Sequence, residues 1–139
     1  MDSLTDMIQL GLSNLWTYGV SFLAVLGLLV FVHEWGHYII ARLCGVRVEV
    51  FSIGFGPELF GRNDRHGTRW KFSAIPLGGY VKMLDEREAP VAPEELHRAF
   101  NRQSVWRRSA IVAAGPGANF LLALILYWGI FWNGTNELR

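Results

Sequence analysis

Two long stretches of this chain carry no charged side chain. The first begins at Met7 and ends at the pair His33-Glu34, and the second runs from Ser109 to Asn136. A helix needs about 20 consecutive apolar residues to cross the hydrocarbon core of a bilayer. Both stretches are long enough, so the sequence predicts two transmembrane helices.

The overall composition supports a membrane protein and excludes several other classes. The 139 residues are 51% hydrophobic and 18% charged, whereas soluble domains carry about 25% charged residues. The net charge of +1 gives no basic excess of the kind that binds nucleic acid. The single cysteine rules out an internal disulfide framework.

The uncharged stretches divide the chain into five parts. The first stretch is not typical of a signal peptide, because Asp2 and Asp6 replace the basic start of such peptides. We therefore expect an N-terminal lead at 1–14, a transmembrane helix at 15–41, a connecting region at 42–108, a second transmembrane helix at 109–132 and a polar end at 133–139.

The basic residues predict the orientation in the membrane. Twelve of the thirteen Lys and Arg residues lie between Arg42 and Arg108, and none precedes Arg42. Loops rich in Lys and Arg stay on the cytoplasmic side. The connecting region is therefore expected in the cytoplasm and both ends of the chain outside it.

The connecting region also contains strand patterns. Residues 46–53 and 69–74 alternate apolar and polar side chains, as a strand with one buried face does, and 78–84 is a candidate third strand. One interpretation is a β-hairpin or small sheet that lies against the membrane near the functional site. The other is an ordinary cytoplasmic hairpin. The predicted fold is thus a mainly α membrane protein with two transmembrane helices and a β-hairpin region between them.

A helix start is predicted shortly before the second transmembrane segment. Pro93, followed by two glutamates, fits the first turn of a helix because its φ angle is fixed and acidic groups favour the helix dipole. Such a helix would carry Leu96, Phe100 and Trp106 towards the second transmembrane segment.

The motif HEWGH, residues 33–37, indicates a metal site. Residues i and i+4 share a face of a helix, so His33 and His37 can both direct a ring nitrogen at one metal ion. Zn²⁺ lowers the pKa of a bound water to about 7. Glu34 is placed to take the proton of that water and pass it to the leaving nitrogen of a peptide bond.

The position of this motif strengthens the metal interpretation. A charged side chain at the centre of a membrane helix costs about 2.5–3.5 kcal/mol, and such residues are functional candidates. The alternative is an ordinary cluster at the cytoplasmic edge, since Arg42 lies five residues after His37. Motif and setting together favour zinc.

Two histidines leave a catalytic zinc site incomplete. Such sites usually have three protein ligands. His66, His97 and Asp85 all lie in the charged connecting region and are expected to be solvated. The third ligand is therefore expected outside this chain.

The second transmembrane segment begins with the sequence AGPGANF, residues 114–120. Pro116 should kink the helix, and the small residues around it allow a neighbouring backbone to come close. Asn119 could hydrogen-bond a substrate carbonyl, a developing oxyanion or a neighbouring helix. A packing role is favoured when the residue is considered alone. However, Asn119 and Glu34 are expected at comparable depth, because both lie near the cytoplasmic ends of their helices.

Together these motifs resemble the bacterial site-2 protease family, peptidase family M50, and within it the regulator of sigma-E protease subgroup. The resemblance extends from about Leu15 to Trp132 and rests on four motifs. They are HEWGH, VRVEVFSIGFG, IPLGGYVKML and AGPGANF.

The resemblance implies an inner-membrane zinc protease that cuts single-pass transmembrane proteins within the lipid bilayer. Typical substrates are anti-sigma factors or remnant signal peptides. His33 and His37 match the zinc ligands, and Glu34 matches the catalytic glutamate. Asn119 matches the asparagine of a G-P-x-x-N motif. Gly54, Phe55 and Gly56 match a membrane-reentrant β region thought to hold substrate as an extended strand.

The chain departs from the family pattern in one respect. The family takes its third zinc ligand from an aspartate in an L-D-G motif on a later helix, and this chain has no L-D-G sequence. Members of the subgroup also carry PDZ domains and further helices. We therefore expect this chain to be the N-terminal part of a longer protein and incomplete as an enzyme.

Two other functions remain open from the residues. One is a membrane-anchored zinc enzyme that acts on soluble cytoplasmic substrates, against which the kinked segment with Asn119 argues. The other is a non-catalytic scaffold that binds transmembrane helices, against which the intact HEWGH motif argues.

Overall fold

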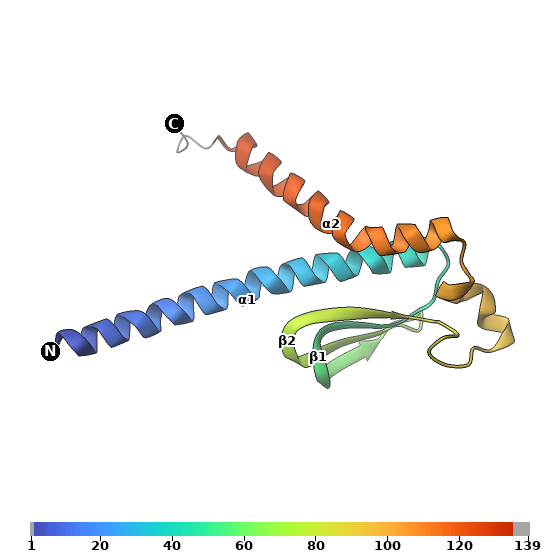
Figure 1. Ribbon diagram of the computed structural model, residues 1–139, viewed down its shortest axis with the longest axis horizontal. Coiled ribbons are helices and arrows are strands. Elements are labelled where there is room, and N and C mark those ends of the chain that lie inside the picture. The colour runs from blue at the N-terminus through green and yellow to red at the C-terminus, as the bar shows by residue number, and fades with distance from the viewer. Residues whose placement is uncertain (1, 135–139) are drawn as a thin grey trace.

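A computed structural model describes residues 2–134 as two long helices with a small sheet between them in the sequence (Figure 1). Figure 1 shows the sheet beside the C-terminal half of the first helix, while the N-terminal part of that helix projects away from the rest of the chain. The elements are α1 (Ser3–Leu43), β1 (Val48–Asn63), β2 (Arg69–Met83), two 3₁₀ helices (Pro93–Arg98 and Phe100–Arg102) and α2 (Val105–Trp132).

Both long helices have the length and apolarity needed to cross a membrane, as predicted. Their boundaries differ from the predicted ones. The lead at 1–14 is helical from Ser3, because no proline or charge cluster interrupts it, and α2 begins at Val105, four residues early. The Ser104 side chain caps α2 by accepting a hydrogen bond from the Arg107 N–H.

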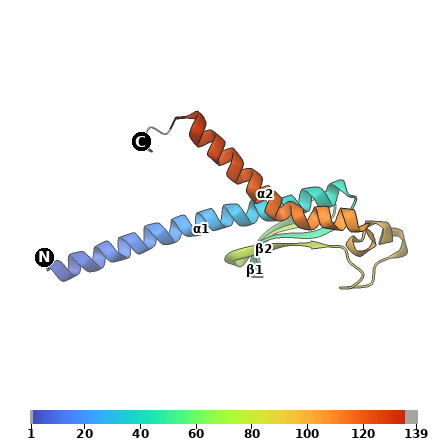
Figure 2. The same ribbon diagram turned by 45° about the horizontal axis from the view of Figure 1, so that its top comes forward.

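Small residues allow α1 and α2 to cross closely. Gly36 is buried, and a Cβ built on it would collide with the Ala114 carbonyl oxygen and lie 2.8 Å from the Ala118 Cβ. Helix pairs in membranes use such small residues to bring their backbones together. Beyond this crossing α2 bends away from α1 (Figures 1 and 2), and Pro116 lies inside the helix, as the kink requires.

The close crossing predicts that Gly36→Ala destabilises the helix pair. Overpacking of a tight contact costs about 1–3 kcal/mol, so the thermal midpoint of the intact protein in detergent should fall. Gly27→Ala is the matched control on the same helix, because a Cβ at Gly27 would have no neighbour within 4 Å. An equal midpoint for the two variants would contradict the packing described here.

The two strands pair as one antiparallel sheet in which each strand bends. The predicted segment 69–74 and residues 78–83 of the candidate third strand belong to the single strand β2, so the prediction of a separate third strand was wrong. Residues 50–53 of β1 have partners on both sides, at 79–82 and at 69–72. Residues 79–83 pair with β1 on one side, which leaves their other edge open.

Glycines make the bend in β1 possible. Gly54 and Gly56 have φ angles of +92° and +82°, which favour glycine. A Cβ on Gly54 would also lie 2.8 Å from the Ile75 carbonyl oxygen. The bend exposes apolar side chains, including Leu59 and Phe60.

The core joins the sheet to the last turns of α1. Tyr38 and Phe51 are buried, and the Phe51 ring stacks on Trp70 with 4.4 Å between centroids. Ile111 of α2, with 1% of its surface exposed, completes this cluster. The core therefore fixes the sheet beside the part of α1 that carries HEWGH.

The segment that precedes α2 differs from the predicted helix. It forms two short 3₁₀ helices, because the Phe100 N–H donates to the Leu84 carbonyl at 2.7 Å and the chain is extended at Ala99 and Gln103. Phe100 packs against the core. Trp106, however, belongs to α2 and is 84% exposed, so its predicted packing was wrong.

Candidate active site

The two histidines of HEWGH lie together on α1. Their Nε2 atoms are 3.1 Å apart, and their ring centroids are separated by 4.8 Å. Two nitrogens bound at about 2.0–2.1 Å to a tetrahedral zinc would lie about 3.3–3.4 Å apart. The spacing of His33 and His37 therefore fits one shared zinc ion.

A hydrogen bond to α2 orients His37. Its Nδ1 lies 2.7 Å from the carbonyl oxygen of Ile111, a distance at which Nδ1–H donates to that oxygen. A neutral imidazole protonated at Nδ1 keeps its lone pair on Nε2. The second nitrogen of a metal-binding histidine is commonly held in this way.

Asn119 of α2 lies where it can orient His33 in the same way. Its Nδ2 lies 3.3 Å from Nδ1 of His33, and its Oδ1 is buried without a hydrogen-bond partner among the described residues. A half-turn of the amide exchanges these two atoms. Oδ1 would then accept from Nδ1–H of His33, which satisfies the buried oxygen and leaves Nε2 of His33 free for a metal.

This contact predicts that Asn119→Leu weakens zinc binding by about 10- to 100-fold, the usual effect of removing a partner of a metal-binding histidine. Asn119→Asp keeps an oxygen acceptor and should weaken binding less. Competitive chelator titration of the intact protein measures both affinities. If the leucine variant bound zinc as tightly as the wild type, Asn119 would have no role in orienting His33.

Space for a cation exists beside the two rings. Gly115 of α2 is buried, and a Cβ built on it would lie 2.8 Å from Nε2 of His33 and would collide with Nε2 of His37. Because glycine has no side chain, a space remains in front of both Nε2 atoms, and we call this space the cradle. The donor set and the cradle fit a zinc ion.

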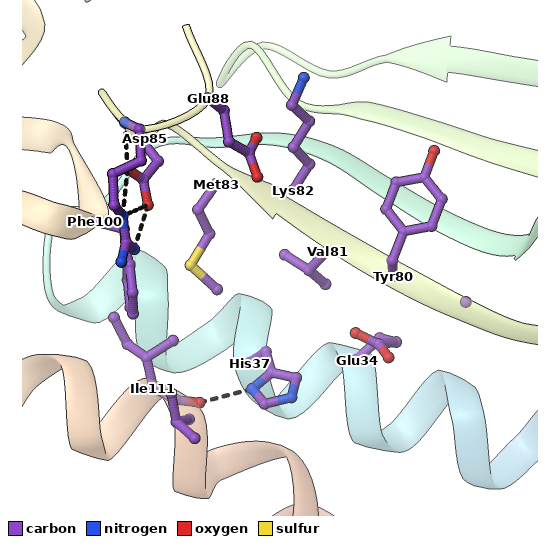
Figure 3. Close-up of a pocket in the computed structure, with 13 residues that line it drawn as sticks. Glu34, His37, Tyr80, Val81, Lys82, Met83, Asp85, Glu88, Phe100 and Ile111 are labelled. Carbon is purple, nitrogen blue, oxygen red and sulfur yellow. Dashed lines mark hydrogen bonds and ion pairs between the residues drawn. The ribbon is translucent and has the colours of Figure 1, made fainter.

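Glu34 projects from α1 between two cavities that adjoin the histidines. The larger, about 350 Å³, lies between α1 and β2 and is lined by Glu34, His37 and residues 79–83 (Figure 3). The smaller, about 240 Å³, is lined by Glu34, His33, Asn119 and Phe55 among others. Glu34 therefore faces both spaces in which a substrate backbone could lie.

The open edge of β2 is a part of the site that was not predicted from the sequence. Residues 79–83 line the larger cavity opposite Glu34 and His37. A Cβ on Gly79 would lie 3.0 Å from Val30 of α1, so this glycine lets the edge approach the helix. The glycine pair Gly78-Gly79, at the start of the predicted 78–84 strand, was the available signal.

The predicted substrate region at Gly54, Phe55 and Gly56 forms the bend of β1. Phe55 reaches the smaller cavity and stacks on Tyr80 with 6.3 Å between centroids. The two glycines provide the bend that brings Phe55 there. Its role in substrate binding stays a prediction.

The other candidate ligands do not join the two histidines. Among residues 2–134 no group of three or more His, Cys, Asp or Glu side chains is placed to hold a metal. Asp85 pairs with Arg87 at 2.6 Å, and this hydrogen bond holds the pKa of the Asp85 carboxyl below its usual value. His66 lies in the turn between the strands, and His97 lies in a 3₁₀ helix.

Comparison with known proteins gives a consistent result. The model of peptidase family M50 matches residues 21–138. The regulator of sigma-E protease RseP of Escherichia coli K12 is 56% identical over 128 residues, which are 92% of this chain and 28% of that protein. Protease RseP of Yersinia pestis is 55% identical over 92% of this chain and 28% of its own length.

A third relative carries zinc in its name. It is a candidate zinc metalloprotease, R01501, of Rhizobium meliloti strain 1021, and it is 52% identical over 89% of this chain and 36% of its own length. The chain thus spans about a third or less of the relatives it matches. The family resemblance predicted from the motifs is confirmed, and this chain belongs to peptidase family M50.

Proposed function

We propose that this chain supplies the N-terminal half of the active site of a zinc metalloprotease that cuts peptide bonds within transmembrane segments. The observation that carries the proposal is the arrangement around Glu34. Two imidazole nitrogens lie 3.1 Å apart on an apolar helix, and an open strand edge faces the same carboxylate across a cavity.

The chemistry follows from the groups that surround this point. His33 and His37 would hold Zn²⁺, which when bound polarises a carbonyl and makes water acidic. Glu34 takes the proton of the attacking water and later passes it to the leaving amide nitrogen. Ile111 and Asn119 keep the two rings oriented through Nδ1. Asn119 also lines the smaller cavity, where its amide could contact a substrate carbonyl or an oxyanion.

The open edge of β2 gives the substrate a place to lie. A helical substrate hides its peptide bonds in its own hydrogen bonds, so it must unwind before hydrolysis. An unwound segment needs new partners for its main chain, because lipid provides none. Residues 79–83 could supply them by strand addition, as in other peptide-binding sheets.

The proposed placement puts the active site near the cytoplasmic side of the bacterial inner membrane. The dense Lys and Arg content of the connecting region supports this orientation, with both ends of the chain outside the cytoplasm. The exposed apolar bend of the sheet, with Leu59, Phe60 and Leu77, supports insertion of the bend into the bilayer. Substrates would be single-pass proteins such as anti-sigma factors or remnant signal peptides.

The remainder of the protein is needed in this proposal. The third zinc ligand would come from a later helix, and PDZ domains are expected between the two halves. The relatives are long enough for both, since the E. coli protein is matched over 28% of its length. The present chain alone is therefore expected to bind zinc weakly and to lack activity.

A paired cleavage assay tests this function. The intact protein in lipid vesicles is given a single-pass substrate and a soluble peptide of the same sequence without its membrane segment. We expect products cut inside the membrane segment, mapped by mass spectrometry, and no cleavage of the soluble peptide. Preferential cleavage of the soluble peptide would favour the anchored enzyme, and cleavage of neither would favour the scaffold.

Cross-linking locates the substrate within the site. A photo-reactive residue at Lys82, on the open edge, should capture the substrate in a Glu34→Gln background that prevents turnover. The same residue at Lys71 is the control, because Lys71 has strand partners on both sides, Gly61 and Ser52. Equal capture at both positions would contradict strand addition at 79–83.

A further inference from the structure

A third cavity lies at the C-terminal end of α1, apart from the two that adjoin the histidines. It has a volume of about 270 Å³, and five of the side chains that line it are basic or imidazole groups. We call it the basic pocket, formed by Arg42, Arg47, Arg65, His66 and Arg98.

Segments that are distant in the sequence build this pocket. Arg42 lies in the last turn of α1, and the Arg47 N–H donates to the Arg98 carbonyl at 3.0 Å. The turn between the strands carries Arg65 and His66. It is joined to the start of β1 by the Thr68 hydroxyl, which donates to the Val48 carbonyl at 2.7 Å. The fold thus gathers basic residues that the sequence keeps apart.

The Arg47 guanidinium lies against the turn. A Cβ built on Gly67 would lie 3.2 Å from Nη2 of Arg47, and Gly67 has a φ angle of +83°. The glycine therefore lets the turn close over the guanidinium and keeps Arg47 beside the residues of the turn.

Few carboxylates offset the positive charge of the pocket. The Asp64 carboxylate, in the same turn as Arg65, accepts hydrogen bonds from two backbone N–H groups of the turn and from the Trp70 indole. Arg98 pairs with Glu95 at 3.2 Å. Within residues 2–134, Arg42, Arg47 and Arg65 have no carboxylate at ion-pair distance, and no acidic side chain lines the pocket. Guanidinium groups that line one small cavity repel one another, and an anion bound among them relieves that repulsion. Planar guanidinium groups bind phosphate oxygens in pairs.

We propose that the basic pocket binds the phosphate of an anionic phospholipid from the surrounding membrane. If α1 crosses the bilayer as proposed above, Arg42 lies where the apolar helix meets the headgroups, at the depth of lipid phosphates. Basic pockets on the cytoplasmic side of membrane helices are suited to acidic lipids. A zwitterionic lipid fits less well, because the lining has no acidic group for its ammonium.

Lipid titration of the intact protein in neutral detergent tests this proposal. Native mass spectrometry measures the binding of phosphatidylglycerol. In the double variant Arg47→Gln with Arg65→Gln the affinity should fall by about 10- to 30-fold, because each basic residue near a lipid phosphate contributes about 1 kcal/mol. The control double variant, Arg62→Gln with Lys71→Gln, removes the same charge from the sheet outside the pocket and should bind as the wild type does. Phosphatidylcholine should bind weakly to all three proteins.

Each other outcome of the titration overturns the proposal. If the pocket variant binds the lipid as tightly as the wild type, the basic pocket is not the binding site. If the control variant loses as much affinity as the pocket variant, the lipid responds only to the general positive charge of the surface. Inorganic phosphate that competes at the lipid's own concentration would identify free phosphate as the ligand.

Arg65→Gln alone, at an exposed turn position, should weaken binding by about fivefold without affecting folding. Lipid binding needs no proteolysis, so Glu34→Gln should bind phosphatidylglycerol normally even if the proposed protease function fails.

Discussion

Replacing Glu34 with glutamine is expected to abolish proteolysis of a membrane substrate. Glutamine keeps the size of the side chain but cannot take a proton from water. Loss of a general base lowers rates by about 10²- to 10⁴-fold. The measurement is the initial rate of substrate cleavage by the intact protein in vesicles.

The zinc content of the Glu34→Gln protein shows whether activity is lost with the general base or with the metal. Glu34 is not one of the two proposed ligands, so the variant should retain the metal of the wild type. Glu94→Gln is the control, because Glu94 is an exposed residue of a 3₁₀ helix and should leave the rate unchanged. A Glu34→Gln protein that cleaves at the wild-type rate would show that another group is the base.

Gly115→Ala is expected to weaken zinc binding and activity together. The added methyl group would lie in the space in front of His33 and His37, where the proposed zinc fits. Either the metal is displaced or α2 moves away, and overpacking of this kind costs about 1–3 kcal/mol. That cost corresponds to roughly 5- to 150-fold in zinc affinity, measured by chelator competition.

Gly117→Ala makes this test specific. Gly117 lies two residues further along α2, and a Cβ there would have no neighbour within 4 Å. Both variants make the same change in helix propensity next to Pro116. Equal zinc affinities in the two variants would mean that the cradle at Gly115 is not part of the metal site.

Local spacing along one helix was enough to predict the relation between His33 and His37. Their i, i+4 separation fixes a shared face whatever the rest of the chain does, and the structure brings their Nε2 atoms to 3.1 Å. The structure also places Asn119 beside His33, the residue before Glu34, while the depth of both residues in a membrane stays a prediction. That prediction needed no contact information, because both residues lie near helix ends expected on the same side of a membrane.

Strand pairing and the packing of the segment before α2 were not predicted, because both depend on contacts distant in the sequence. Alternation identified strand residues at 46–53 and 69–74, but alternation does not specify a partner. The open edge at 79–83 and the bend at Gly54 therefore came from the structure. The wrong prediction for Trp106 has the same origin, since the hydrogen bond from the Phe100 N–H to the Leu84 carbonyl, at the start of the second 3₁₀ helix, joins residues 16 positions apart.

The most direct test of the central claim is zinc K-edge X-ray absorption of the intact protein with one equivalent of zinc. We expect one tightly held zinc whose spectrum shows two histidine nitrogens at about 2.0–2.1 Å, with both lost in a His33→Ala, His37→Ala protein. A spectrum without histidine scattering, or one unchanged in that double variant, would contradict it.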